Sequence, residues 1–210
     1  MNPLLPYLQP LPLIAVLRGI TPEEIPDVGS ALAGCGFRVL EVPLNSPRAL
    51  DSIRLLAQQS GSECLIGAGT VLAVDDVARV RDAGGRVIVM PHADTAVIRA
   101  AKALGMLCVP GVATPTEAFA ALAAGADGLK MFPAEALPPA ALRAWRAVLP
   151  ADTLVFAVGG MKPDNLLPYW KAGASGFGTG SNLYKPRTSP AQVREVALAY
   201  AAAVRELPAR

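Results

Sequence analysis

Short, continuous apolar runs alternate along this chain with longer amphipathic segments that begin at Ser, Thr or Asp and end near glycine. Continuous runs of about four to eight apolar residues are typical of strands covered on both faces, and the segments between them are typical of helices. The pattern predicts eight strands, at Leu13–Leu17, Arg38–Leu44, Cys64–Val71, Arg86–Met90, Leu107–Val112, Gly128–Phe132, Leu154–Val158 and Ala174–Gly178.

The intervening helices are predicted from their terminal residues. Capping boxes are expected at Thr21 with Glu24 and at Thr114 with Glu117, and single caps at Ser46, Asp94 and Ser189. Glycines at the predicted helix ends are Gly34, Gly61, Gly84, Gly105, Gly125 and Gly173. Pro26 removes a backbone donor just inside the first helix, so a distorted first turn is expected there.

The repetition itself predicts the fold. Eight strand–helix units in 210 residues correspond to about 26 residues each, which is compact for a (β/α)8 TIM barrel. An open doubly wound sheet also alternates strands and helices, but the glycine fingerprint of dinucleotide-binding sheets is absent after the first strand. We therefore expect an α/β fold in which residues 1–210 form a single (β/α)8 barrel domain.

Composition narrows the classes of partner. A formal charge of +2 with scattered basic residues argues against nucleic acid, and no apolar run reaches membrane-spanning length. The first eleven residues lack a basic segment and contain three prolines, so no signal peptide is expected. The three cysteines, without paired spacing, are expected to be reduced and buried in a cytoplasmic protein.

A lysine and a glutamate stand inside apolar strands. Burial disfavours the ammonium form of Lys130, and a neutral lysine is a nucleophile suited to a Schiff base with a carbonyl substrate. A lysine that snorkels from the strand end is the plainer interpretation. Glu41 lies in the second predicted strand, where a carboxylate is costly unless it is catalytic or paired. A purely structural ion pair between Glu41 and Lys130 therefore remains open.

Other candidate residues stand where the predicted strands end. In a barrel of this type the chemistry lies at these carboxyl ends. Arg18 follows the first predicted strand and is placed to bind an anion. Asn45 follows the second predicted strand, and Thr70 lies near the end of the third. The glycine-containing turns at Gly159–Gly160 and Gly180–Ser181 follow the last two strands, a common phosphate site in such barrels.

Metal chemistry finds little support in the sequence. His92 is the only histidine, which excludes multi-histidine metal sites and histidine relays. His92 is expected at the barrel rim, where it could touch substrate. No metal and no other cofactor is expected.

Six separated motifs resemble one known family. They are Leu17-Arg18-Gly19-Ile20, Glu41-Val-Pro-Leu-Asn-Ser-Pro47, Gly67-Ala-Gly-Thr-Val71, Leu129-Lys130-Met131-Phe132-Pro133, Phe156-Ala-Val-Gly-Gly160 and Gly180-Ser181. Their order and spacing are similar to those of the 2-keto-3-deoxy-6-phosphogluconate/galactonate aldolases, over nearly the whole chain. The resemblance implies a class I aldolase on a (β/α)8 barrel that needs no metal and generally forms a homotrimer.

The resemblance also implies roles for individual residues. The Schiff-base lysine falls on Lys130 and the proton-transferring glutamate on Glu41. The substrate contacts fall on Arg18 and Thr70 at the pyruvate carboxylate and on the backbone around Gly159, Gly160 and Ser181 at the phosphate. Asn45, Phe132 and Val158 are further residues expected to bind substrate. The implied ligands are a phosphorylated 2-keto-3-deoxy sugar acid, pyruvate and D-glyceraldehyde 3-phosphate.

Within the family, the motifs around Glu41 and Val158 resemble the 6-phosphogalactonate branch. The gluconate branch usually has threonine in place of Val158 and arginine in place of Asn45. Phe132-Pro133-Ala134-Glu135 is more similar to the gluconate branch. The galactonate substrate is therefore expected, and a gluconate-type or dual-epimer aldolase is the alternative. More distant alternatives are an isomerase or metal-assisted decarboxylase and a non-catalytic sugar-phosphate-binding barrel.

Overall fold

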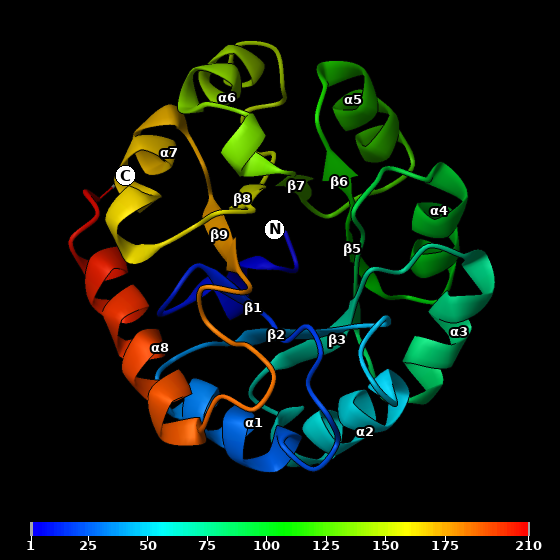
Figure 1. The fold of residues 1–210 in the computed structure, drawn as a ribbon. Helices are drawn as coiled ribbons and strands as arrows, with labels where there is room; N and C mark the ends of the chain where they lie inside the picture. Colours follow the sequence, from blue (N-terminus) through cyan, green and yellow to red (C-terminus); the bar gives the residue numbers. More distant parts are fainter. Residues whose placement is uncertain (1, 210) are drawn as a thin grey trace.

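The computed structural model describes residues 2–209, which form a closed barrel of parallel strands surrounded by helices (Figure 1). The strands are β1 (Leu13–Val16), β2 (Val39–Pro43), β3 (Leu65–Gly69), β4 (Val87–Val89), β5 (Leu107–Val109), β6 (Gly111–Val112), β7 (Leu129–Met131), β8 (Val155–Val158) and β9 (Gly176–Thr179). The helices are α1 (Ile25–Gly34), α2 (Ala49–Ser60), α3 (Val74–Asp82), α4 (Thr95–Ala103), α5 (Pro115–Ala123), α6 (Pro139–Arg146), α7 (Leu166–Ala172) and α8 (Pro190–Arg205), with short 3-10 turns η1 (Leu5–Leu8), η2 (Ala134–Ala136) and η3 (Pro163–Asn165).

The sheet closes on itself. β1 pairs in parallel with both β2 and β9, and the strand order runs from β5 through β1 to β6. β5 and β6 are two halves of the predicted run Leu107–Val112, which is divided at Pro110, a residue without a backbone N–H. β5 pairs with β4 and β6 pairs with β7, so this one run completes the ring. The barrel prediction is confirmed, and the open doubly wound sheet is wrong.

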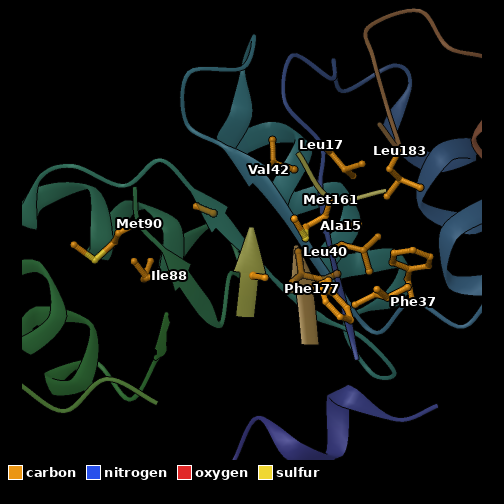
Figure 2. Close-up of a cluster of buried hydrophobic side chains, with 14 of the residues drawn as sticks. Ala15, Leu17, Phe37, Leu40, Val42, Ile88, Met90, Met161, Phe177 and Leu183 are labelled. Atoms are coloured by element: carbon orange, nitrogen blue, oxygen red, sulfur yellow. The ribbon is translucent and has the colours of Figure 1, made fainter. Parts of the chain in front are cut away.

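Alternation along each strand divides the buried side chains into two sets. Odd-numbered and even-numbered residues of a strand face opposite sides of the sheet. In β2, Leu40 and Val42 belong to the large cluster between strands and helices, which Figure 2 shows in part. Val39 instead joins a smaller cluster inside the barrel, together with Phe156 and Val158 of β8. This parity turns Glu41 of β2 toward the barrel interior.

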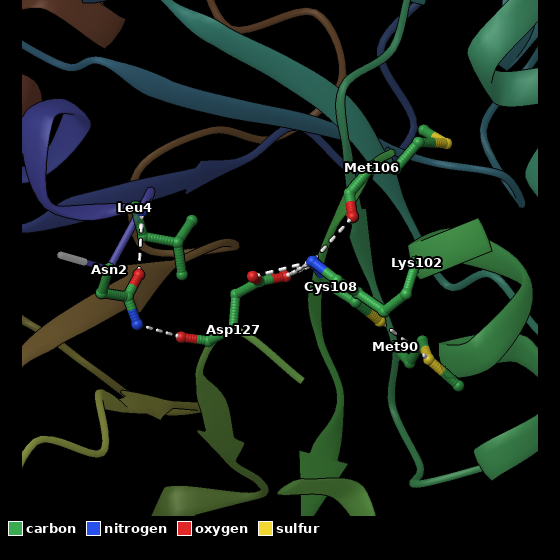
Figure 3. A network of polar contacts seen from close by, with 7 residues as sticks. All are labelled: Asn2, Leu4, Met90, Lys102, Met106, Cys108 and Asp127. Carbon is green, nitrogen blue, oxygen red and sulfur yellow. Dashed lines mark hydrogen bonds and ion pairs between the residues drawn. The ribbon is translucent and has the colours of Figure 1, made fainter. Parts of the chain in front are cut away.

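The N-terminal segment covers the end of the barrel at which the strands begin. Leu4 and Leu8 pack in the interior cluster. The Asn2 side chain donates to the Asp127 carbonyl at 2.7 Å, and the Asp127 carboxylate accepts from Lys102 Nζ at 2.8 and 2.6 Å (Figure 3). The same carboxylate accepts from the Cys108 amide at 2.8 Å. This end of the barrel is thus sealed by apolar contacts and a satisfied polar network.

Several predicted caps are confirmed. Thr114 and Ser189 form capping boxes with Glu117 and Gln192, and the Asp94 side chain accepts from the Ala96 and Val97 amides. These three helices begin where the sequence predicted.

Two predicted helix starts are wrong. Ser46 does not cap a helix, because its hydroxyl accepts from the Gly19 amide at 2.9 Å, and α2 begins only after Arg48, whose φ is 45°. The Thr21–Glu24 segment is a turn ahead of α1, which begins at Ile25. Pro26 therefore lies in the first helical turn, where a missing donor is tolerated.

The predicted helix ends are confirmed at Gly84, Gly105, Gly125 and Gly173, all of which have positive φ. α1 and α2 also end at the predicted glycines, since Gly34 is the last residue of α1 and Gly61 directly follows α2, but neither of them has positive φ. The left-handed residue after α1 is Gly36. None of the helices within residues 2–209 has the length and apolar character needed to cross a membrane.

Candidate active site

Two ionisable side chains point into the barrel from opposite sides of the ring. Leu129 and Met131 of β7 pack outward against the helices, so Lys130 between them faces the interior. Lys130 is 6% exposed and Glu41 of β2 is 1% exposed. Their charges influence each other, yet they form no direct ion pair within the described residues. Lys130 is enclosed in the middle of β7 and does not snorkel.

The Glu41 carboxyl group has an unusual environment. Burial raises its pKa to about 7, although the positive charges of Lys130 and Arg18 and the nearby Gly69 amide oppose the change. Its Oε2 atom is buried without a hydrogen-bond partner. A Cβ atom added at Gly69 of β3 would overlap this carboxylate. Glu41 is therefore able to take up and release a proton near neutral pH.

The Lys130 amine is shifted in the opposite direction. Burial lowers its pKa, the Glu41 charge opposes this, and the Arg18 charge adds to it. Its Nζ atom lies 4.5 Å from the centre of the Phe132 ring. A larger neutral fraction makes the amine a better nucleophile at physiological pH.

A small polar network joins three strand ends at the rim. The Arg18 guanidinium, after β1, donates to Asn45 Oδ1 at 2.7 Å and to Thr70 Oγ1 at 3.4 Å. Thr70 follows β3 with a φ of 55°, an uncommon conformation for a β-branched residue. Such strain often marks a functional site. The three residues that the sequence suggested are thus brought together.

Some of these groups line one cavity of about 360 Å³ at the carboxyl ends of the strands. Seven predicted residues line it, namely Arg18, Lys130, Phe132, Val158, Gly159, Gly160 and Ser181. Glu41, Asn45 and Thr70 are not in its lining but are linked to it through Arg18 and Lys130. The volume is typical of a site for a small metabolite.

Two glycine-containing turns form one wall of the cavity. Gly159 and Gly160 have φ values of 105° and 69°, so both require the left-handed region. Asn165 donates to the Gly160 carbonyl at 2.9 Å and Asn182 donates to the Met161 carbonyl at 3.1 Å. The turns after β8 and β9 are therefore fixed to each other.

Sequence reasoning missed several lining residues, namely Val16, Gly19, Met161, Gly178, Asn182, Tyr184, Lys185 and Pro186. Lys185 is the one with an available signal, since it is a basic residue close behind the last strand. His92 is exposed and does not line the cavity. Within residues 2–209, no group of three His, Cys, Asp or Glu side chains is placed to hold a metal ion.

The chain is also similar to known proteins. Residues 6–196 match the family described as KDPG and KHG aldolase. The chain belongs to this family, and it is an aldolase, a carbon–carbon lyase.

Particular relatives lie within one branch of the family. The probable 2-dehydro-3-deoxy-6-phosphogalactonate aldolase of Rhizobium meliloti (strain 1021) is 51% identical over 192 residues, covering 91% of each chain. The 2-dehydro-3-deoxy-6-phosphogalactonate aldolase of Escherichia coli (strain K12) is 46% identical over 196 residues, covering 93% of this chain and 96% of its own. A solved structure described as native KDPGal superposes with a TM-score of 0.93 at 46% identity, covering 94% of this chain and 96% of its own.

Proposed function

We propose that this chain cleaves 2-dehydro-3-deoxy-6-phosphogalactonate to pyruvate and D-glyceraldehyde 3-phosphate through a Schiff base at Lys130. The observation that carries the proposal is a buried lysine of lowered pKa that lines a cavity and is electrostatically coupled to the buried Glu41. The two curated relatives carry this activity in their names, which supports the choice of substrate.

The reaction begins with the neutral Lys130 amine. It attacks the 2-keto carbon, and loss of water gives a protonated imine that withdraws electrons from the adjacent carbon. The face of the Phe132 ring, with its centre 4.5 Å from Nζ, favours this cation.

Cleavage then requires a base. Glu41, through a water molecule, removes the C4 hydroxyl proton, and the electron pair of the C3–C4 bond flows into the imine to form an enamine. D-glyceraldehyde 3-phosphate leaves as the aldehyde. The enamine takes up a proton at its methylene carbon, and water releases pyruvate and the free amine. A Glu41 pKa of about 7 suits a group that both accepts and returns protons near neutral pH.

The two ends of the substrate bind at opposite sides of Lys130. The Arg18 guanidinium and the Thr70 hydroxyl, already joined at 3.4 Å, bind the carboxylate end. The backbone amides of the Gly159–Gly160 turn and the neighbourhood of Ser181 bind the phosphate end. Binding energy at the phosphate holds the reacting carbons in place.

Selection at C4 depends on the side chains nearest that hydroxyl. Val158 is 8% exposed and lines the cavity with two methyl groups and no hydrogen-bonding atom. One configuration at C4 would bury its hydroxyl against these methyl groups without a partner, whereas the other turns it toward Asn45 or a water near Glu41. The galactonate epimer is the favoured substrate and the gluconate epimer is cleaved more slowly.

We also propose that the protein acts as a cytoplasmic homotrimer, as the family resemblance implies. Sedimentation equilibrium of the purified protein checks the assembly, for which a mass three times that of one chain is expected. A monomer that retains full activity would contradict it.

The proposed function is tested by offering the purified protein both C4-epimeric phosphorylated substrates and measuring pyruvate and D-glyceraldehyde 3-phosphate. Both products are expected in equal amounts, with a higher specificity constant for the galactonate epimer. Preference for the gluconate epimer would support the alternative substrate. No cleavage of either epimer would contradict the proposal.

A further inference from the structure

The charged side chains that line the cavity are all basic. Arg18, Lys130 and Lys185 line it, and none of its lining residues is acidic. Arg18 is engaged with Asn45 and Thr70, and Lys130 stands where the imine is proposed to form. The Lys185 ammonium makes no hydrogen bond or ion pair in the part of the chain that the structure describes. One exposed cation is therefore left beside the glycine turns.

The loop that carries Lys185 is held in one conformation. Lys185 to Thr188 form a turn closed by the Thr188 amide, which donates to the Lys185 carbonyl at 3.0 Å. Pro186 and Arg187 occupy its centre, and Arg187 has a φ of 69°, as in a type II turn. Glycine or asparagine usually fills that position, so an arginine there is strained unless neighbouring contacts fix it.

Glu24, from the turn before α1, supplies those contacts. Its Oε1 atom accepts from the Arg187 amide at 2.9 Å and from the Tyr184 hydroxyl at 3.0 Å, and Oε2 accepts from the Thr21 amide at 3.0 Å. Burial opposes the charged form, but these donors outweigh it, so the pKa of the Glu24 carboxyl group lies below its ordinary value.

A steric contact adds to the polar ones. Gly19 has a φ of 81°, and a Cβ atom added there would lie 2.8 Å from Pro186 Cγ. The turn therefore lies directly against the backbone that follows Arg18. The loop is fixed on one side by Glu24 and on the other by Gly19.

We infer that Lys185 is the cation that binds the phosphate of the substrate, and that Glu24 is a positioning residue for the loop that carries it. The inference rests on the proposed function and adds to it a charged ligand beside the backbone donors. It also fixes the direction of the substrate, with the carboxylate at Arg18, the carbonyl at Lys130 and the phosphate at Lys185.

The test compares the phosphorylated substrate with its unphosphorylated analogue, 2-keto-3-deoxygalactonate. For Lys185→Met, kcat/KM for the phosphorylated substrate is expected to fall about tenfold, mainly through KM, because a charge-assisted contact is lost. The value for the analogue is expected to stay within twofold. Lys171→Met, which removes an exposed lysine from α7, is the matched control and is expected to change neither value.

Glu24 is tested by the same pair of substrates. Glu24→Ala is expected to raise KM for the phosphorylated substrate with kcat largely retained, because the turn loses its acceptors. Glu24→Gln keeps an oxygen that can accept from the Arg187 amide and the Tyr184 hydroxyl, so it is expected to restore most of the affinity. A Gln variant as impaired as the Ala variant would overturn the positioning role.

Trapping with pyruvate, which has no phosphate, separates this inference from the proposed function. Lys185→Met is expected to form the Lys130 adduct at the parental rate. If the adduct forms and kcat/KM falls equally for both substrates, or falls for neither, the Lys185 assignment is wrong. If the parent protein forms no adduct at all, the proposed function fails instead.

Discussion

Two lysine–carboxylate pairs occupy opposite ends of this barrel and differ in almost every respect. At the end where the strands begin, Lys102 and Asp127 are in direct contact at 2.6 Å, and the carboxylate also accepts from the Cys108 amide. At the other end, Lys130 and Glu41 are more deeply buried and are not paired directly. Lys102 and Asp127 satisfy each other's charges, whereas Lys130 and Glu41, the pair proposed to react, remain available to a ligand.

The largest expected effect separates the two lysines. Lys130→Met removes the nucleophile, so cleavage is expected to fall to the background rate while the fold is retained. Lys102→Met is expected to leave the activity per folded molecule unchanged. It is also expected to lower the free energy of unfolding by about 1–3 kcal/mol, less than for a fully buried ion pair because Lys102 is partly exposed. Steady-state kinetics and urea unfolding of both variants check the contrast. Equal decreases in the free energy of unfolding, with full activity in both variants, would contradict the difference between the two lysines.

The second effect concerns the base. Glu41→Gln is expected to form the imine with pyruvate but to cleave substrate roughly 10²–10⁴-fold more slowly, because the proton acceptor is lost. Single-turnover cleavage and adduct formation, measured on one preparation, check this. Near-parental cleavage would show that Glu41 is structural.

The same substitution predicts a change in pH dependence. Parent cleavage is expected to rise with pH through about 7, as Glu41 ionises. The Glu41 charge raises the pKa of Lys130, so its removal lowers that pKa further and lets the amine react at lower pH. Cyanoborohydride trapping with pyruvate across pH 5–9 measures this. A shift of adduct formation to higher pH in Glu41→Gln would contradict this expectation.

A third effect on activity is expected at Gly69, because the Glu41 carboxylate lies directly against this residue. Ala at this position requires Glu41 to move, and a displacement of about 1 Å can cost roughly 10²-fold in rate. Gly69→Ala is expected to lose activity and to keep its thermal midpoint within a few degrees. Gly34→Ala, at a helical glycine with open space around it, is the control for the same chemical change. Similar kinetics in the two variants would show that the contact has no catalytic consequence.

The smallest effect is on choice of substrate. A buried hydroxyl without a partner costs about 1–3 kcal/mol, so the parent is expected to prefer the galactonate epimer by roughly tenfold to hundredfold. Val158→Thr supplies a partner of nearly the same size and is expected to narrow or reverse that preference. Imine formation with pyruvate serves as the control and is expected not to change. Equal specificity constants of the parent protein for the two epimers would show that Val158 does not select the substrate.

The fold could be predicted because apolar strand runs separated by helical segments are local signals, repeated eight times. The buried positions of Lys130 and Glu41 could be predicted because a charged residue inside an apolar strand is conspicuous without any knowledge of its neighbours. The missed features depend on distant contacts. Glu24 and Tyr184, which are hydrogen-bonded, lie 160 residues apart in the sequence. The Ser46 hydroxyl accepts from the Gly19 amide and does not cap a helix. The left-handed Thr70 and the closeness of Gly69 to Glu41 likewise arise from packing between strands.

Lys130, and not Lys102, is the proposed nucleophile, and one measurement tests this assignment directly. The protein is incubated with pyruvate and borohydride and then digested. The mass of each lysine-containing peptide is measured by mass spectrometry. One reduced pyruvyl adduct per chain is expected, on the peptide that contains Lys130, and none is expected in Lys130→Met. An adduct on the Lys102 peptide, or an unmodified Lys130 in an active preparation, would contradict the claim.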